Sequence, residues 1–205
     1  MNVERILIIR LSSIGDILLA SPLLRVLRRR FPQATIDFVT KRQFVDLVRT
    51  NPHLNHIHTL DTRKGRAALA ELKSTLRNKS YDLMVDIHNN FRSVYLRRLP
   101  NATVVKIRKY KFKRFLLVKL GWNVYKKITP VYQRYINTVA PFGVEDDGLG
   151  LEFFLDPDVA QQLLVDLQHR DFNPKCLTIA VAAGAGFATK RWPVQHYINV
   201  ARHFV

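Results

Sequence analysis

The chain has 205 residues, of which 47% are hydrophobic, and its 33 Lys and Arg against 16 Asp and Glu give a net charge of +17. This composition supplies a sizeable core and excludes wholesale disorder. The single Cys176 excludes an intrachain disulfide, and no stretch approaches the roughly 20 apolar residues of a membrane span. The apolar run at 6–9 is too short for a signal peptide, so we expect a cytoplasmic protein.

The first thirty residues predict a strand, a tight turn and a helix. Residues 6–9 are a continuous apolar run rich in β-branched side chains, which is typical of a strand buried on both faces of a parallel sheet. The polar turn at 11–16 contains Ser12, Ser13 and Gly15, and the apolar helix after it ends in three arginines. Ligands of open α/β sheets bind beyond the carboxyl ends of the strands, which is where this turn is expected to lie.

Asp16, at the end of that turn, has two interpretations. As an ordinary structural residue it caps the N-terminus of the following helix, a position that Asp favours. As a functional residue it is a carboxylate at a substrate crevice that acts as general base. A dinucleotide-binding fingerprint is excluded, because that motif needs three glycines and Gly15 stands alone here.

Further along, strand and helix patterns alternate, which predicts βαβ units and a parallel sheet. The expected strands are 35–40, 57–60, 81–87 and 102–107, and the expected helices are 43–49, 67–77, 130–142 and 157–169. After a linker at 171–175, a strand at 177–182 leads to a Gly-containing loop and a helix opened by Pro193. We therefore predict one domain over 1–170 and, over 171–205, the start of a second that breaks off in mid-helix.

Between Asp86 and Glu145 the chain has no acidic residue. The same interval holds thirteen cations: Arg92, Arg97, Arg98, Lys106, Arg108, Lys109, Lys111, Lys113, Arg114, Lys119, Lys126, Lys127 and Arg134. Such a block attracts a polyanion. Within it, residues 111–125 interleave basic and bulky apolar side chains, which suits a helix lying on an anionic membrane, a surface for single-stranded nucleic acid, or a helix with its apolar side in the core.

Two segments resemble the signatures of a known family. Residues 10–32 read R-L-S-S-I-G-D-I-L-L-A-S-P-L-L-R-x-L-R-x-x-F-P, and residues 184–193 read G-A-x-x-x-x-K-R-W-P. Both are similar to segments of the ADP-heptose:lipopolysaccharide heptosyltransferases, glycosyltransferase family 9, whose members are longer than this chain. The resemblance implies an α/β, GT-B-like fold, with a Rossmann-like parallel-sheet domain that binds the acceptor followed by a nucleotide-sugar domain.

The resemblance also implies a function. An inverting, metal-independent enzyme that needs no cofactor would move heptose from ADP-heptose to Kdo or heptose in the lipopolysaccharide inner core. Its expected partners are a lipid A–Kdo type glycolipid and the anionic inner-membrane surface, to which it would bind peripherally as a monomer, with no nucleic acid. The alternative from another class is a non-catalytic basic module that binds RNA or an anionic membrane.

The implied site has three parts. Asp16 is the catalytic base, and Ser12 and Ser13 line the same turn. The acceptor, which carries carboxylate and phosphate groups, is expected to meet Arg63, Lys64, Arg66, Arg114 and Arg134. The diphosphate of the donor is expected at Gly184, Ala185, Gly186, Lys190 and Arg191, where small residues let the backbone approach a phosphate beside two cations. His88, Asn89 and Asn90 follow a strand end and are further candidates for the acceptor.

Overall fold

The computed structural model describes residues 3–125, 128–170, 172–173 and 175–204. It divides into two units, Met1–Asp156 and Pro157–Val205. None of the described residues after Pro157 is buried, so the second unit has no packed core. The predicted division into domains at 170 and 171 therefore stays a prediction.

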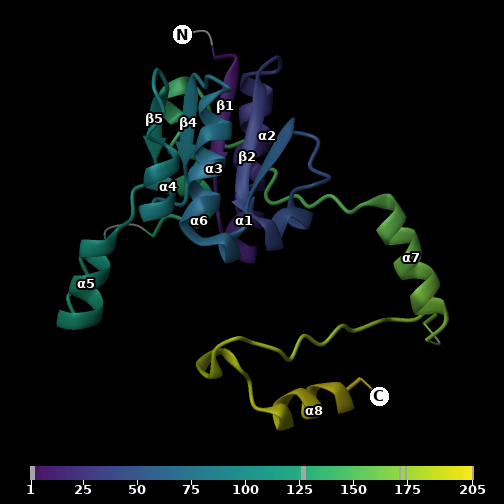
Figure 1. Cartoon of the computed structure of the whole chain (residues 1–205). Helices are drawn as coiled ribbons and strands as arrows, with labels where there is room; N and C mark the ends of the chain where they lie inside the picture. The colour runs from purple at the N-terminus through teal and green to yellow at the C-terminus, as the bar shows by residue number, and fades with distance from the viewer. Residues whose placement is uncertain (1–2, 126–127, 171, 174, 205) are drawn as a thin grey trace. The chain divides into compact units, whose positions relative to one another are not determined.

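The first unit is built on a five-stranded sheet in the order β3-β2-β1-β4-β5, and every pairing is parallel (Figure 1). The strands are β1 (Arg5–Ile9), β2 (Thr35–Lys41), β3 (His56–Leu60), β4 (Leu83–Asp86) and β5 (Thr103–Lys106). This is the strand order of Rossmann-like folds, so the predicted α/β class is confirmed.

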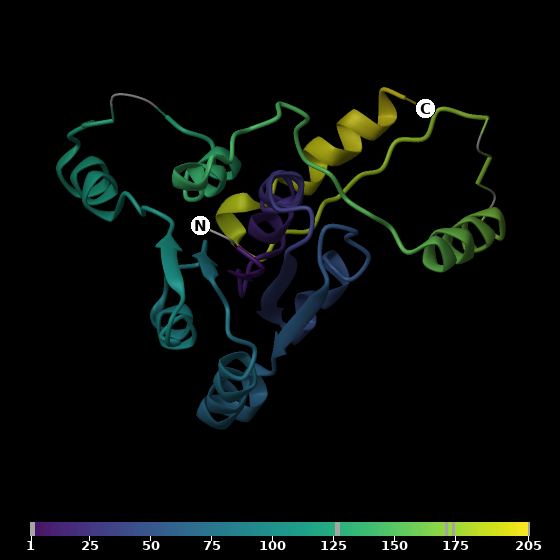
Figure 2. The ribbon, with the colours of Figure 1, turned by 90° about the horizontal axis from the view of Figure 1, so that it is seen from above.

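Two hydrophobic cores cover the two faces of the sheet, because successive side chains of a strand point to opposite sides. Ile6 and Ile8 of β1 belong to the core with α2 (Ser21–Arg30) and α6 (Val131–Ile136). Leu7 and Ile9 belong to the core with α3 (Gly65–Arg77) and α4 (Phe91–Leu96). Figure 2 shows these two pairs of helices on opposite sides of the sheet.

The helix expected after the first turn is two helices, α1 (Ile14–Leu18) and α2. Pro22 explains the break, because proline has no N–H and its ring clashes with the carbonyl four residues earlier, that of Leu18. The Leu18 carbonyl instead accepts a hydrogen bond of 2.9 Å from the Ser21 hydroxyl. A single continuous helix was therefore the wrong prediction.

Two more predicted helices are shorter than expected. The helix expected over 130–142 is α6 followed by the 3-10 turn η3 (Ala140–Phe142), because Pro141 cannot continue an α-helix. The segment 111–125 forms α5 (Lys111–Leu120), which stops at Gly121 in the left-handed conformation with φ 70°. Lys126 and Lys127 of the basic block lie outside the described residues.

Helix α4 was not predicted. Its signal is short and polar: Asn90 is the N-cap, and its side chain accepts a hydrogen bond from the Ser93 N–H while the Ser93 hydroxyl accepts one from the Asn90 N–H. The helix expected over 43–49 is the 3-10 segment η1 (Arg42–Leu47), and a further 3-10 turn, η2 (Thr62–Lys64), precedes α3.

The second unit contains α7 (Pro157–Gln168), the 3-10 turn η4 (Ala188–Lys190) and α8 (Val194–Arg202). Residues 177–182 were predicted to be a strand, and this was wrong: residues 177–187 are irregular and mostly exposed. A strand needs a neighbour to satisfy its N–H and C=O groups, and the described residues of this unit supply none. The last helix ends at Arg202 rather than running on, and Asp171 and Pro174 of the predicted linker lie outside the described residues.

In the part of the chain that the structure describes, every helix is too short or too polar to cross a bilayer.

Candidate functional site

A cavity of about 800 Å³ lies at the carboxyl ends of β1, β4 and β5. Its wall includes Arg10 and Asp16 after β1, His88 after β4, and Ile107 and Lys109 after β5. β1 and β4 are neighbours in the sheet, but the chain reaches β4 only after running outward through β2 and β3. Such a reversal point is where open α/β sheets bind ligands, and the volume lies within the usual range of about 300–1,000 Å³ for ligand pockets.

Asp16 is hydrogen-bonded to the N-cap residue of α1 and lines this cavity. Ser13 is the N-cap residue, and Asp16 stands three residues later, where its carboxylate accepts hydrogen bonds from the Ser13 N–H at 3.3 Å and the Ser13 hydroxyl at 2.9 Å. Asp16 was predicted to be the N-cap of this helix, but the N-cap in the structure is Ser13. The Asp16 side chain remains 35% exposed, so its structural contacts leave it accessible.

Arg10 forms an ion pair with the same oxygen of Asp16, Oδ2. Arg10 is itself buried, donates a hydrogen bond of 2.7 Å to the Ile87 carbonyl and lies 5.6 Å from the centre of the Tyr135 ring. Burial by itself raises the pKa of Asp16, but the Arg10 charge and the Ser13 hydrogen bonds outweigh it, so that the pKa lies below its ordinary value of 3.8. Asp16 is thus a carboxylate at neutral pH.

His88 is a neutral group in the same wall. Burial, together with the nearby charges of Arg10 and Lys109, lowers the pKa of His88 to about 4. Asn90 donates its side-chain N–H to His88 Nε2 at 2.8 Å, since the Asn90 oxygen is already used by the Ser93 N–H. Nε2 is therefore the acceptor and Nδ1 carries the proton, and Nδ1 is itself buried with no hydrogen-bond partner among the described residues.

Tyr135 packs under the Arg10–Asp16 pair from α6. Its side chain is 1% exposed, and burial raises the pKa of its hydroxyl to about 12, an effect that the neighbouring Asp16 carboxylate supports. The hydroxyl is protonated and uncharged across the physiological range, so it can donate one hydrogen bond and accept others.

Two of the predicted acceptor residues, Arg114 and Arg134, line the cavity with Asp16. Arg134 donates a hydrogen bond of 2.6 Å to the Arg108 carbonyl and lies 4.8 Å from the centre of the Tyr110 ring, so its position is held from two directions. The cavity therefore combines one carboxylate with cations from separate parts of the chain.

Other predicted acceptor residues do not line this cavity. Arg63 and Lys64 lie in η2, and Arg66 is in the first turn of α3, after the outer strand β3. Arg63 pairs with Asp61 at 2.9 Å and lines a smaller pocket, as does Lys64. Ser12 is half-buried in the turn between Arg10 and Asp16 without lining the cavity.

The predicted diphosphate residues form an exposed loop in the second unit. Gly184, Ala185 and Gly186 precede η4, which ends at Lys190. Arg191 donates a hydrogen bond of 2.9 Å to the Ala185 carbonyl, and Lys190 lies 5.4 Å from the centre of the Phe187 ring. The loop thus places both cations beside its small residues.

Arg10, Lys109 and Tyr135 belong to the cavity but were not predicted as site residues. Arg10 carried a usable signal, since it is a charged residue placed directly after a buried strand, at the binding edge of a parallel sheet. Lys109 had a weaker signal, because it lies three residues after β5, which is mostly exposed. Tyr135 had none, because nothing in the sequence indicates which core face α6 covers. Among the described residues no cluster of three or more His, Cys, Asp or Glu is placed to hold a metal ion.

The fold is that of a doubly wound α/β protein, with a cavity at the carboxyl edge of its parallel sheet, which is where proteins of this class bind ligands. Residues 69–205 match the sequence profile of glycosyltransferase family 9 (heptosyltransferase), and the chain belongs to this family. It is 22% identical to lipopolysaccharide heptosyltransferase 1 of Pseudomonas aeruginosa over 96% of its own length and 57% of that protein.

Two solved structures share the fold. The glycosyl transferase family 9 protein from Veillonella parvula has a TM-score of 0.81 at 23% identity, covering 100% of this chain and 61% of that one. The E. coli heptosyltransferase WaaC with ADP-2-deoxy-2-fluoro heptose has a TM-score of 0.63 at 21% identity, covering 96% and 64%. The predicted GT-B-like class is confirmed, and the chain spans roughly three fifths of the length of these proteins.

Proposed function

We propose that this chain carries the acceptor site and the beginning of the donor site of an inverting, metal-independent heptosyltransferase. The enzyme would move heptose from ADP-heptose to a Kdo or heptose hydroxyl of the lipopolysaccharide inner core. The observation that carries the proposal is the cavity itself, in which Asp16 faces four cations, Arg10, Lys109, Arg114 and Arg134. Family membership supports the reaction class, and the ADP-heptose analogue in the WaaC structure supports the donor.

Asp16 is the proposed general base. Its contacts with Ser13 and Arg10 all use Oδ2, so Oδ1 is the oxygen best placed to take a proton from the acceptor. As that proton leaves, the acceptor oxygen attacks the anomeric carbon of heptose, and the bond to the diphosphate breaks with its electron pair staying on ADP. One carboxylate is enough, because a single displacement inverts the configuration without a covalent intermediate.

The cations of the cavity are proposed to bind the acidic groups of the acceptor. A lipid A–Kdo type glycolipid carries carboxylates and phosphates, and guanidinium groups bind both through paired hydrogen bonds. Arg63, Lys64 and Arg66 follow β3, whose carboxyl end lies on the same sheet edge, and they are proposed to contact more distant parts of this large acceptor. Ser12 and Ser13 shape the turn that carries Asp16.

In the second unit, Lys190 and Arg191 are proposed to stabilise the ADP leaving group. Charge develops on the diphosphate as the sugar departs, and cations with nearby backbone N–H groups offset it. Gly184, Ala185 and Gly186 allow the close approach of backbone that such a contact requires. The enzyme is proposed to work as a monomer at the cytoplasmic face of the inner membrane. A non-catalytic module for RNA or membranes is not favoured, since the chain belongs to a glycosyltransferase family.

The test is product formation by the full-length protein. It is incubated with ADP-heptose and a soluble Kdo-containing acceptor, in the presence of EDTA, with UDP- and GDP-sugars in parallel. We expect heptose addition by mass spectrometry with ADP-heptose alone, and an inverted anomeric configuration by NMR. Transfer from another nucleotide sugar, or loss of transfer in EDTA, contradicts the proposed donor or the metal-independent mechanism.

A further inference from the structure

The segment from Tyr110 to Tyr125, called the α5 hairpin below, is a helix followed by a return segment, and its two ends are in contact. α5 ends at Gly121, whose left-handed conformation turns the chain back. The rings of Tyr110 and Tyr125 then meet edge to face with their centres 6.1 Å apart, and the Lys113 ammonium lies 5.5 and 5.8 Å from the two ring centres. This aromatic–cation cluster holds the two ends of the hairpin together.

The hairpin has one side on the cavity. Arg114 and Leu117 of α5 line the cavity, together with Tyr110 and Tyr125 at the base of the hairpin. Arg134, also in the wall, lies against the Tyr110 ring. This side of the hairpin is therefore part of the proposed acceptor site, whereas Phe112 and Phe115 are not among the residues that line it.

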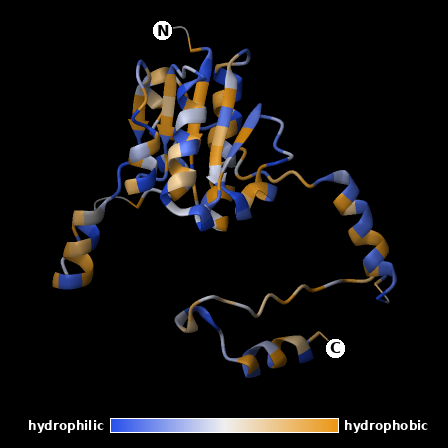
Figure 3. Cartoon of the chain, in the orientation of Figure 1, coloured by the Kyte–Doolittle hydropathy of each residue, from blue (hydrophilic) through white to orange (hydrophobic). Residues whose placement is uncertain are grey.

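Large apolar side chains of the hairpin are exposed and do not line the cavity. Phe112 is 72% exposed, Phe115 54% and Trp122 64%. Phe112 and Phe115 each precede a cavity residue by two positions, which is about 200° around a helix of 3.6 residues per turn. Val118 and Leu120 are exposed as well, and Figure 3 shows apolar and hydrophilic residues mixed along α5.

The charges around the hairpin indicate what covers this apolar surface. Lys113, Arg114 and Lys119 lie on α5 itself, within the stretch from 87 to 144 that has no carboxylate. Bulky apolar side chains beside cations suit the headgroup boundary of an anionic bilayer, where each cation contributes about 1 kcal/mol of attraction. Single-stranded RNA fits less well, because the aliphatic Val118 and Leu120 offer no ring for a base to stack on.

We propose that the α5 hairpin seats Phe112, Phe115 and Trp122 in an anionic lipid surface while its other side lines the acceptor cavity. An acceptor glycolipid would then reach Asp16 from the membrane plane without leaving the bilayer. The entry route rests on the proposed function, whereas the membrane contact does not.

Trp122 reports on the contact directly. The chain has two tryptophans, so Trp192→Phe leaves Trp122 as the single indole. On addition of phosphatidylglycerol-containing vesicles we expect a blue shift of the emission and quenching by lipids brominated on their acyl chains. Pure phosphatidylcholine vesicles should give at least about tenfold weaker binding, and high salt should reverse binding to the anionic vesicles. An unshifted Trp122 in vesicle-bound protein, or equal binding to both vesicles, overturns the proposal.

Matched variants distinguish membrane binding by the hairpin from non-specific binding by other exposed apolar residues. Phe112→Ser combined with Phe115→Ser should lower the vesicle partition coefficient at least about tenfold, because burying a Phe side chain contributes about 1.5–3 kcal/mol. The control is Phe91→Ser on α4, which is 73% exposed and lies outside the hairpin, and which should bind as the parent does. Circular dichroism confirms folding of each variant. Equal losses in both, or displacement of the chain from vesicles by equimolar RNA, contradict the proposal.

A final comparison distinguishes this inference from the proposed function. In the full-length protein the double variant should lose heptose transfer to an acceptor embedded in vesicles and keep transfer to a soluble, delipidated acceptor. Equal activity of the variant on both acceptors overturns the entry route alone. Failure of the parent protein on both acceptors contradicts the proposed function and leaves the vesicle measurements standing.

Discussion

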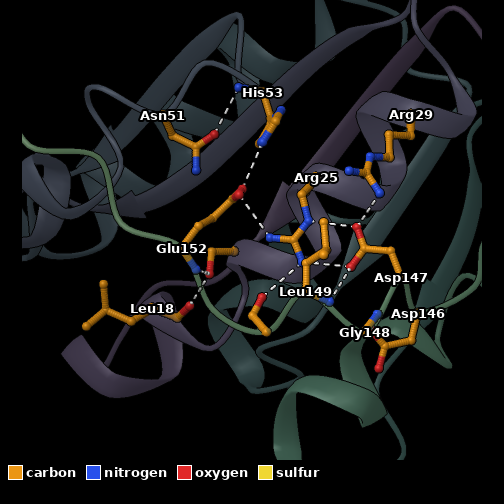
Figure 4. A network of polar contacts seen from close by, with 12 residues as sticks. Leu18, Arg25, Arg29, Asn51, His53, Asp146, Asp147, Gly148, Leu149 and Glu152 are labelled. Atoms are coloured by element: carbon orange, nitrogen blue, oxygen red, sulfur yellow. Dashed lines mark hydrogen bonds and ion pairs between the residues drawn. The ribbon is translucent and has the colours of Figure 1, made fainter.

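Two buried arginines of the first unit, Arg10 and Arg25, form similar ion pairs with carboxylates, but the two carboxylates differ in how exposed they are. Arg25 on α2 holds both oxygens of Asp147 at 2.8 Å, Glu152 at 2.9 Å and the Gly150 carbonyl at 2.9 Å (Figure 4). Arg10 holds one oxygen of Asp16, whose side chain is 35% exposed at a cavity, whereas that of Asp147 is 13% exposed. The pairing chemistry is the same, and the difference in exposure makes one pair purely structural and leaves the carboxylate of the other accessible from a cavity.

The Arg25 network fixes the segment from Asp147 to Glu152 onto α2. Arg29 also pairs with Asp147, at 2.6 Å, and His53 with Glu152, at 2.8 Å. The Arg25 hydrogen bond holds the pKa of Asp147 at about 2, so this carboxylate stays ionised and paired at any physiological pH. The polar groups of the Arg25 network are hydrogen-bonded or ion-paired within the protein, so few of them are left to bind a ligand.

The largest expected effect comes from Asp16→Asn in the full-length protein. The amide cannot take the acceptor proton, so we expect heptose transfer to fall about 100- to 10,000-fold, measured at a temperature at which circular dichroism shows the variant folded. The matched control is Asp46→Asn, an exposed carboxylate whose loss should leave transfer unchanged. Residual activity within tenfold of the parent, about 1.4 kcal/mol of barrier, would show that Asp16 is not the base.

Arg25→Met should have the opposite effect: it should lower the free energy of unfolding more than it lowers heptose transfer. It leaves two largely buried carboxylates without their main partner, which costs on the order of 3 kcal/mol. The Arg29 side chain is 56% exposed, so Arg29→Met removes only a peripheral partner of Asp147 and should lower the free energy of unfolding by less than about 1 kcal/mol. Urea unfolding of the two variants measures the difference, and equal costs would mean that burial does not distinguish the two arginines.

Arg10→Gln should change the pH dependence of transfer. Burial raises the pKa of Asp16 and the Arg10 charge lowers it, so removal of that charge should raise the pKa. Because the base must be ionised, the acid limb of the kcat/KM profile should lie at higher pH in the variant than in the parent. A parent-like acid limb in a folded Arg10→Gln protein would show that another group controls it.

The smallest effect concerns His88. Its pKa of about 4 means that the cavity gains no charge from this residue between pH 5 and 8, which an NMR titration of the ring nitrogens measures directly. The unfolded chain takes up this proton near pH 6.5, so the native state binds fewer protons between about pH 4 and 6.5 and stability rises with pH there. His88→Gln should flatten this part of the stability profile, and a His88 midpoint above 6 would contradict the buried, neutral assignment.

Much of the first unit was predictable because its signals are local. The apolar run at 6–9 and the Ser12–Asp16 turn specify a buried strand and a polar loop without reference to the rest of the chain. Arg10 was missed because its role needs three distant partners, the Ile87 carbonyl after β4, Tyr135 of α6 and the cavity between them. The strand expected at 177–182 failed for the complementary reason, since its pattern was right for a strand but the described residues of that unit hold no neighbour to pair with.

The sequence by itself determined the five strands of the first unit, the family resemblance, and Asp16 as a candidate base, because hydrophobic period, turn residues and motif spacing are properties of neighbouring positions. Tertiary structure alone decided which charges share a site. It brought Arg114 and Arg134 to Asp16 and left Arg63, Lys64 and Arg66 outside the cavity, although all five are basic residues of the same predicted domain. Strand order places the ends of β1, β4 and β5 side by side, and that adjacency follows from how the chain crosses the sheet.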